Sequence, residues 1–461
     1  MKKVTPIVLS GGVGSRLWPL STKNVPKQFL NLPFGSKRNL FQQTINGIKK
    51  SKSFHNPLII CASGHKFLVK DSLGKLFQNS SIIVEKIQRN TAISILLGIF
   101  FSIKNSDYSL VVPSDHFIKN RDYSKMIPKN LQSFKGHIIY GIVPNYATTD
   151  YGYIEVEDSK KKISTVKNFF EKPTKIKANL FIKKKFFWNS GIFLLNNKKL
   201  LLDFKKYHPK IYKICESITE CLVSDLGFYE TSEKSMRKLP NISFDKAILE
   251  KNDNLSMMKV NFVWKDLGTW NSLDTLSSPK NLSLVKDSYI HNSSKNTTVI
   301  SDRKFTIVND LSNVIVVSNK ESLFISSKKE SGKIKEILSN KKFNETLDYQ
   351  TIFYKPWGHY EVILRATNYL LKKITVNPNH RLSLQKHKFR SEHWVVVKGV
   401  AIVTRGKQKK VLKKNQSTFI PVGMEHCLEN KGKVPLEIVE IQMGDILSET
   451  DIVRLDDPYK R

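Results

Sequence analysis

Cysteine is scarce in this chain of 461 residues, which contains 4 of them. They form neither the Cys-x-x-Cys pairs of a zinc site nor the framework of a disulfide-rich fold. The four positions are Cys61, Cys215, Cys221 and Cys427. We therefore expect a reducing compartment, the cytoplasm, as the location of the protein.

Long apolar runs are also missing. The longest, residues 92–103, is too short to span a membrane and predicts a buried helix instead. Lys2 and Lys3 resemble the start of a secretory signal, but Pro6 and Gly11 interrupt the apolar stretch that follows them. We expect neither a signal peptide nor a membrane partner.

Acidic residues are few, 40 against 76 lysines and arginines, so the formal net charge is +36. Such a charge is typical of proteins that bind nucleic acid or anionic membranes. Here, however, the lysines are scattered in pairs and triplets, and no nucleic-acid motif accompanies them. We therefore expect no nucleic-acid partner; retention on heparin or DNA at physiological salt would reverse this interpretation.

The chain is long enough for two or three domains, and its 40% hydrophobic content is that of a globular protein. Up to about residue 275, short apolar strands alternate with helix-like stretches, a pattern that predicts a doubly wound α/β domain over 1–278. The clearest strands are expected at 58–60, 82–84, 110–112 and 137–143.

The rest of the chain is rich in predicted β-strands. Residues 279–349 are expected to form a β-rich connecting module, with strands at 298–300 and 314–317 and a helix over 327–342. From 350 to 461 alternating strands predict a small β-sandwich or barrel. Its expected strands include 370–376, 394–397, 400–404 and 436–441.

A glycine-rich turn follows the first apolar strand, residues 7–9. Gly11, Gly12 and Gly14 can adopt positive φ angles and let a ligand approach the backbone. Successive N–H groups in such a turn form an anion-binding nest. The spacing fits neither the dinucleotide fingerprint nor the P-loop. An ordinary strand-to-helix turn is the alternative to a polyphosphate site.

Two cations follow the turn: Arg16 and, after Pro26, Lys27. The run Gly-Gly-x-Gly-x-Arg-Leu-x-Pro-Leu…Pro-Lys resembles the signature of the sugar-1-phosphate nucleotidyltransferases. With Trp18 and Pro-Lys-Gln-Phe it looks most like their mannose-1-phosphate guanylyltransferase branch. The resemblance implies a Rossmann-like, GT-A-type domain that binds nucleotide. The implied nucleotide-binding residues are Ser10, Gly11, Gly12, Gly14, Arg16, Arg89, Asn90 and Thr91.

Two aspartates are candidate metal ligands. Asp115 ends the predicted strand 110–112, and ligands collect at the carboxyl ends of strands in open α/β sheets. Asp266 lies beside Gly268 in a second such segment. One or two carboxylates commonly hold Mg²⁺ on phosphates, although Asp115 could instead cap a helix. Both segments resemble the family motifs whose aspartates bind magnesium.

Further segments resemble the sugar-phosphate side of the same family. The resemblance implies that Glu171 and Asn189 contact sugar hydroxyls and that Lys172 contacts the phosphate. Tyr151 and Gly152 belong to the same side. One departure is Asp150, which adds a carboxylate where the family has glycine and would cost affinity for an anionic sugar unless it points outward.

The implied reaction joins GTP to mannose 1-phosphate, giving GDP-mannose and pyrophosphate for polysaccharide synthesis. It needs no covalent intermediate, because positioning and charge neutralisation supply most of the rate. Arg16 would stabilise the triphosphate, whereas Lys27 and Lys172 would hold charge near the attacking phosphate. Asp115 and Asp266 complete the catalytic set. The sequence does not distinguish guanine from other bases.

A second cluster lies in the C-terminal part. Gln385 and His387 share one strand face, Glu392 follows, and a Pro-x-Gly turn leads to His426. Two nitrogens, a carboxylate and an amide oxygen suit Zn²⁺, Co²⁺ or Mn²⁺. The spacing is that of the cupin metal motif, with Gln385 in place of its first histidine.

Residues 354–461 as a whole resemble the type II phosphomannose isomerase domain. This resemblance implies a cupin barrel that interconverts mannose 6-phosphate and fructose 6-phosphate, with Arg390 stabilising phosphate or enediolate charge. Departures occur at Asn379, where the family has glycine, and at Lys388 and Phe389, where it has histidines. The alternatives are a transferase with a structural or regulatory cupin domain and a basic binding protein. The oligomeric state stays open, a homo-oligomer included.

Overall fold

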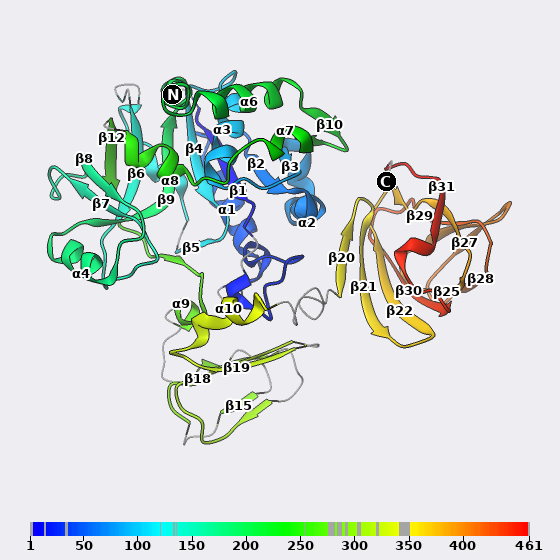
Figure 1. Cartoon of the computed structure of the whole chain (residues 1–461). Helices are drawn as coiled ribbons and strands as arrows, with labels where there is room; N and C mark the ends of the chain where they lie inside the picture. Colours follow the sequence, from blue (N-terminus) through cyan, green and yellow to red (C-terminus); the bar gives the residue numbers. More distant parts are fainter. Residues whose placement is uncertain are drawn as a thin grey trace. The chain divides into compact units, whose positions relative to one another are not determined.

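The computed structural model describes residues 3–12, 15–32, 36–119, 121–131, 134, 136–252, 254–274, 282–283, 288–290, 294–301, 306–319, 322–340 and 351–459. Contacts divide the chain into two compact units, Met1–Asp348 and Tyr349–Arg461, which are described separately (Figure 1). The predicted division of the first unit into 1–278 and 279–349 stays a prediction.

The first unit is built on a mixed eleven-stranded sheet in the order β10-β11-β3-β2-β1-β4-β9-β6-β12-β8-β7. β1 pairs in parallel with β2 and β4, so the carboxyl ends of these strands meet at one edge. The strands are β1 Thr5–Ser10, β2 Leu58–Ala62, β3 Ser81–Glu85, β4 Tyr108–Pro113, β6 His137–Ile142, β7 Tyr153–Val156, β8 Ile163–Phe170, β9 Phe187–Asn196, β10 Val223–Asp225, β11 Phe228–Glu230 and β12 Leu255–Lys259.

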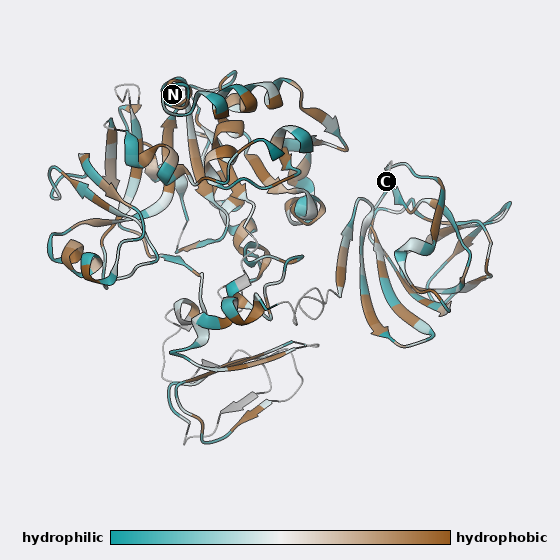
Figure 2. Cartoon of the chain, viewed as in Figure 1, coloured by the Kyte–Doolittle hydropathy of each residue, from teal (hydrophilic) through white to brown (hydrophobic). Residues whose placement is uncertain are grey.

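Helices pack against this sheet. α3 is almost entirely buried, as its apolar sequence predicts, and a Cβ on Gly98 would press on the methyl groups of Ile7 and Ile60 at 3.0 and 3.1 Å. α6 is amphipathic, and in Figure 2 α4 shows both teal and brown. The helices are α1 Leu40–Lys49, α2 Lys66–Leu73, α3 Thr91–Ser102, α4 Lys175–Lys183, α5 Asn197–Tyr207, α6 Pro209–Glu220, α7 Glu233–Arg237, α8 Phe244–Ala247 and α9 Trp270–Asp274.

A separate two-stranded ribbon carries both candidate aspartates. β5 His116–Ile118 pairs antiparallel with β13 Trp264–Asp266, so that His116 lies opposite Asp266. Because Asp115 directly precedes β5, this ribbon brings the two carboxylates to the same end. The strand after Asp115 also means that this residue does not cap a helix.

The β-rich residues that follow belong to the first unit. Strands β14 to β18 alternate between a four-stranded sheet and a two-stranded sheet, and β19 then pairs with β18 in the larger one. Ile315 and Phe324 from this part share a core cluster with Leu17 and Trp270. The helix predicted over 327–342 is shorter, because the preceding strand extends to Ser327. The elements are β14 Leu282–Ser283, β15 Ser288–Ile290, β16 Thr298–Ser301, β17 Thr306–Val308, β18 Val314–Ser318, β19 Leu323–Ser327 and α10 Ile334–Leu338.

The second unit consists of two six-stranded antiparallel sheets with a hydrophobic core of its own. One sheet has the order β20-β21-β22-β30-β25-β28; the other has β27-β26-β29-β24-β31, with β23 paired to β29. The strands are β20 Ile352–Lys355, β21 Gly358–Arg365, β22 Tyr369–Val376, β23 His380–Arg381, β24 Leu384–His387, β25 Arg390–Lys398, β26 Ala401–Arg405, β27 Gln408–Leu412, β28 Ser417–Ile420, β29 His426–Asn430, β30 Leu436–Gly444 and β31 Ile452–Asp456. This is the predicted cupin barrel.

Within the described ranges, no helix has the length and apolar character needed to cross a membrane.

Candidate active sites

A cavity of about 500 Å³ opens at the carboxyl ends of β1, β3 and β4. It joins segments far apart in the sequence, including the turn after β1, the start of α3 and the end of β13. The predicted site residues that line it are Gly11, Gly12, Asn90, Thr91, Asp115, Tyr151, Gly152, Glu171, Lys172, Asn189 and Asp266. The fold thus gathers most of the predicted nucleotide and sugar-phosphate residues around one space.

Other predicted residues do not line this cavity. Ser10 is buried at the end of β1, and Arg16 is exposed on the short helix η1 Ser15–Leu17. Nε of Arg89 donates to the carbonyl of Met236 at 3.0 Å, so its guanidinium is bound to backbone beside α7. Gly14 lies outside the described residues.

Lys27 lies between the two candidate metal ligands. Its Nζ is 2.8 Å from Oδ2 of Asp115 and 2.7 Å from Oδ1 of Asp266, and the lysine side chain is 4% exposed. Burial opposes its charge, but the two carboxylates outweigh burial and raise the pKa of Lys27. Burial likewise opposes the charge of Asp115, yet the ammonium group lowers the pKa of that carboxyl. Lys27 and Asp115 therefore stay charged together over a wide pH range.

The sugar-phosphate side contains a carboxylate absent from the predicted set, Asp245. Its Oδ1 accepts from Nδ2 of Asn189 at 2.9 Å, while Oδ1 of Asn189 accepts from the amide of Gly191 at 3.1 Å. Burial first, and then the charge of Glu171, raises the pKa of Asp245 to about 7. A Cβ on Gly152 would come within 2.8 Å of Oε2 of Glu171, so a larger residue there would push this carboxylate aside. This arrangement fixes the amide of Asn189 toward the cavity.

Asp150, the departure in this region, lines the cavity. Its Oδ2 accepts from the hydroxyl of Thr148 at 3.2 Å. The departure therefore lies at the site and not elsewhere on the surface.

The opposite end of the cavity presents the buried carboxylate Glu85, at the end of β3. Its Oε1 accepts from the hydroxyl of Ser94 at 2.7 Å. Burial raises the pKa of Glu85 to about 7. Two amides brace the glycine turn: Gln28 donates to the carbonyl of Gly12 at 3.1 Å, and Gln88 donates to that of Gly11. Glu85 is not in the predicted set. Like Asp115, it is a carboxylate at the carboxyl end of a buried strand, and this position could have indicated it from the sequence.

In the second unit, three predicted ligands form one buried cluster. Nε2 of His387 is 3.0 Å from Oε1 of Glu392, and Nε2 of His426 is 3.5 Å from Oε2 of the same carboxylate. The three ligand atoms lie within 4.8 Å of one another. The other ring nitrogens face backbone carbonyls, of Asp451 at 3.2 Å and of Met424 at 2.8 Å.

These contacts fit a bound cation. A hydrogen bond from Nδ1–H to a carbonyl leaves the lone pair of Nε2 free for a metal, the usual arrangement of histidine ligands. Nε2 of His426 is buried and has no hydrogen-bond partner, a costly state that a metal ion would relieve. The donor set of two imidazoles and a carboxylate is one that zinc and similar divalent ions accept.

Gln385, the fourth predicted ligand, is buried and lies opposite His426 in the strand register. Its Oε1 accepts from the hydroxyl of Ser383 at 2.9 Å. Gln385 thus lies beside His426, and its role as a fourth ligand stays a prediction.

Arg390 braces the cluster and is itself 2% exposed. Its Nε donates to Oε1 of Glu392 at 3.1 Å, and its Nη1 donates to the carbonyl of Ser448 at 2.7 Å. The space beside the cluster is about 40 Å³ and is also lined by Lys372 and Glu440. Burial, followed by the charge of Glu392, raises the pKa of Glu440 to about 8. This space is much smaller than a sugar phosphate, so the barrel must widen to admit one.

The departures in this unit lie outside the cavity. Asn379 adopts φ 59°, a left-handed conformation that asparagine tolerates. This conformation is also accessible to the glycine that the resemblance places at this position. Phe389 is exposed and Lys388 does not line the space beside the cluster. Their amides donate to the carboxylate of Asp451 at 3.3 and 2.9 Å.

Comparison with known proteins identifies the families of both units. Residues 5–279 match the family described as "Nucleotidyl transferase", and residues 341–457 match "Mannose-6-phosphate isomerase C-terminal". A mannose-1-phosphate guanylyltransferase of Escherichia coli is 35% identical over 472 residues, which cover 99% of each chain. The chain belongs to this family.

Other relatives support the assignment. The alginate biosynthesis protein AlgA of Pseudomonas syringae pv. tomato is 34% identical, with 99% of this chain and 96% of the relative covered. The crystal structure of a "mannose-1-phosphate geranyltransferase" from Thermus thermophilus superposes with a TM-score of 0.65 at 22% identity. It covers 74% of this chain and 100% of its own and shows the shared α/β fold. The guanylyltransferase–isomerase family predicted from the sequence is thus confirmed.

Proposed function

We propose that this chain transfers GMP from GTP to α-D-mannose 1-phosphate and also interconverts mannose 6-phosphate and fructose 6-phosphate. The observation that carries the transferase half is the ion-paired cluster of Lys27, Asp115 and Asp266 at the rim of a cavity large enough for a nucleotide. The names of the full-length relatives supply the substrates.

In the transferase reaction, a phosphate oxygen of mannose 1-phosphate forms a bond to the α-phosphorus of GTP. The bond between that phosphorus and the bridging oxygen breaks, and pyrophosphate leaves with the electron pair. Both reactants are anions, so catalysis consists chiefly of alignment and charge neutralisation. Lys27 and Lys172 supply positive charge, and the turn at Gly11 and Gly12 supplies amides. Arg16 lies outside the cavity, so its side chain would have to move from η1 to reach the triphosphate.

Glu85 is our candidate for guanine recognition. It lines the cavity, it is buried, and Ser94 binds its Oε1. An ionised carboxylate accepts hydrogen bonds from N1–H and the 2-amino group of guanine, whereas adenine offers an acceptor at N1. The arrangement therefore favours GTP over ATP.

Asn189, Asp245 and Glu171 are positioned to bind the hydroxyls of the sugar. Their carboxylates accept from hydroxyls, and the amide of Asn189 is already oriented by Asp245. The carboxylate of Asp150, which the hydroxyl of Thr148 binds, would repel the anionic sugar phosphate. We therefore expect Asp150 to weaken the affinity for mannose 1-phosphate.

Both sites have residues that suit a divalent cation. Asp115 and Asp266 would hold Mg²⁺, which neutralises phosphate charge when bound. In the barrel, His387, Glu392, His426 and Gln385 would hold Zn²⁺, Co²⁺ or Mn²⁺, which polarises the substrate carbonyl oxygen when bound. Arg390 would keep Glu392 ionised and in place. Moving the proton between C1 and C2 requires a base, for which the nearby carboxylate of Glu440 is our candidate.

The direct test uses the purified chain with mannose 1-phosphate, Mg²⁺ and each of the four common nucleoside triphosphates, with pyrophosphate release as the signal. We expect GTP to give the highest kcat/KM. A parallel assay follows conversion of fructose 6-phosphate to mannose 6-phosphate. Transferase activity without isomerase activity would favour a structural or regulatory barrel. Neither activity in a folded chain would refute the proposal.

A further inference from the structure

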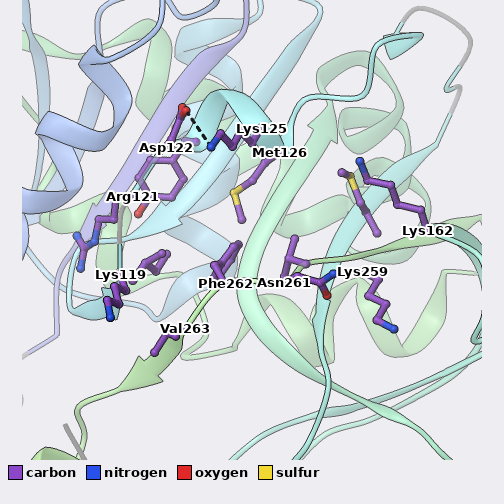
Figure 3. Close-up of a pocket in the computed structure, with 14 residues that line it drawn as sticks. Lys119, Arg121, Asp122, Lys125, Met126, Lys162, Lys259, Asn261, Phe262 and Val263 are labelled. Carbon is purple, nitrogen blue, oxygen red and sulfur yellow. Dashed lines mark ion pairs between the residues drawn. The ribbon is translucent and has the colours of Figure 1, made fainter. Parts of the chain in front are cut away.

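A second cavity of about 470 Å³ lies behind the β5–β13 ribbon and shares no lining residue with the transferase cavity (Figure 3). Its walls come from the segment that follows β5, from the end of β12 and from the residues leading into β13. Five basic side chains line it, and Asp122 is the one acidic residue among the lining side chains. The basic residues are Lys119, Arg121, Lys125, Lys162 and Lys259.

The positive charge of this cavity is only partly balanced. Asp122 pairs with Lys125 at 4.0 Å. In the described part of the chain, no carboxylate lies within ion-pair distance of Lys119, Lys162 or Lys259. Figure 3 shows Lys119 on one side of the cavity and Lys162 and Lys259 on the other. Nζ of Lys259 lies 5.9 Å from the centre of the Phe187 ring, outside the lining of the cavity. An excess of basic side chains around one space favours a ligand with more than one negative charge.

Arg121 differs from the lysines because its guanidinium binds backbone carbonyls of the protein. It is buried, its Nη1 donates to the carbonyl of Leu40 at 3.0 Å, and its other contacts include the carbonyl of His116. These bonds tie the wall of the cavity to α1 and to the ribbon. Nε of Arg121 is buried without a hydrogen-bond partner. The guanidinium of Arg121 therefore fixes the wall and is not itself available to a ligand.

The floor of the cavity is apolar. Tyr123, Met126 and Met258 are buried there, and Phe262 adds a half-buried ring. Such a floor suits a heterocyclic base better than a polyhydroxylated sugar. The volume also falls in the range usual for small-molecule sites, about 300–1,000 Å³.

We propose that this cavity binds a nucleoside diphosphate, with its phosphates on the rim lysines and its base on the methionine and phenylalanine floor. The site is separate from the proposed transferase site and does not depend on it. Asn261, exposed on the rim, offers an amide to the ribose or base.

The test counts binding sites for GDP on the full-length chain by equilibrium dialysis with Mg²⁺ present. The test variant is Lys119→Glu/Lys259→Glu. A charge-matched control, Lys198→Glu/Lys205→Glu, changes two exposed lysines of α5. We expect the test variant to bind one equivalent less than the control, with at least a roughly tenfold loss of affinity at the missing site. Equal numbers of sites in the two variants would overturn the proposal.

A second measurement locates the ligand. GDP is expected to protect Lys119, Lys162 and Lys259, but not Lys198, from acetylation measured by mass spectrometry. Inorganic pyrophosphate is expected to bind at least roughly tenfold more weakly than GDP, because it cannot use the floor. Unprotected rim lysines, or equal affinity for the two probes, would overturn the assignment of a nucleotide.

Discussion

The two active-site candidates are built in opposite ways. The transferase cavity is wide, about 500 Å³, and its side chains come mainly from turns and strand ends that converge from across the first unit. The barrel site has about 40 Å³, and its ligands His387, Glu392 and His426 all stand on strands. The transferase cavity has room for a large ligand, whereas the space in the barrel is small and lined by paired charged side chains.

The difference separates the work of the two halves. A transferase must hold two anionic substrates at once, so an open site with loop-borne amides and cations serves it. An isomerase moves a proton within one substrate, so a buried site on rigid strands serves it once the barrel has widened to admit the sugar phosphate. Each half can therefore be disabled alone, and the following predictions test that independence from the largest expected effect to the smallest.

Lys27→Ala should reduce GDP-mannose formation by at least about a thousandfold, because the charge that neutralises Asp115 and Asp266 is lost. Isomerase activity should stay near wild type. Initial rates of both reactions check this, with Lys49→Ala on the exposed end of α1 as control. An equal loss of both activities in a folded variant would contradict the division of labour.

His426→Ala should remove the metal of the barrel and reduce isomerase activity at least about a hundredfold, since a direct ligand is lost. The transferase should be unaffected when Mg²⁺ is supplied. Metal analysis and both assays test this beside His393→Ala, which changes an exposed histidine next to Glu392. Metal that stays bound in the His426 variant would show that the cluster is not its site.

Glu85→Gln should lower kcat/KM for GTP about 10- to 100-fold, because hydrogen bonds to a charged group are lost. It should also change stability in a pH-dependent way. Burial raises the folded-state pKa of Glu85 to about 7, above its usual value of 4.5. Wild type therefore loses stability as pH rises from about 4.5 through 7, and the variant lacks this loss.

Urea unfolding of both proteins at about pH 4.5 and about pH 8 measures the effect, with Glu220→Gln as an exposed control. The variant should gain stability relative to wild type at the higher pH. A constant difference across this range would remove Glu85 as the titrating group, and an unchanged preference for GTP would remove it as the reader of the base.

Asn379→Val should destabilise the chain by about 1–2 kcal/mol, because a β-branched residue is strained at φ 59°. Asn379→Gly should change stability by less than about 0.5 kcal/mol. Denaturant unfolding of the two variants provides the comparison. Similar midpoints for both would show that the turn does not require a left-handed residue.

The barrel site could be predicted almost completely from sequence, because alternation along a strand fixes which side chains share a face. Gln385 and His387 are two residues apart on β24, and the turn before His426 returns the chain to them. Asn379 could be interpreted in the same way. Its backbone is in the left-handed conformation, and asparagine is one of the few residues other than glycine that tolerate it.

The transferase site was less readable. The bond from Lys27 to Asp266 joins residues 239 positions apart, and no local pattern reveals such a pair. Arg89 could not be told from a phosphate ligand, because the carbonyl of Met236 that binds it comes from another part of the fold. The contact of Asn189 with Asp245 was missed for the same reason.

The position of Lys27 has a consequence for the order of binding. While its ammonium group lies between Asp115 and Asp266, it balances one of their two negative charges, and a metal ion that enters alone has to displace it from both carboxylates. An incoming triphosphate attracts that ammonium group and brings its own cation. We therefore expect the enzyme without nucleotide to bind Mg²⁺ weakly and the cation to arrive together with the triphosphate.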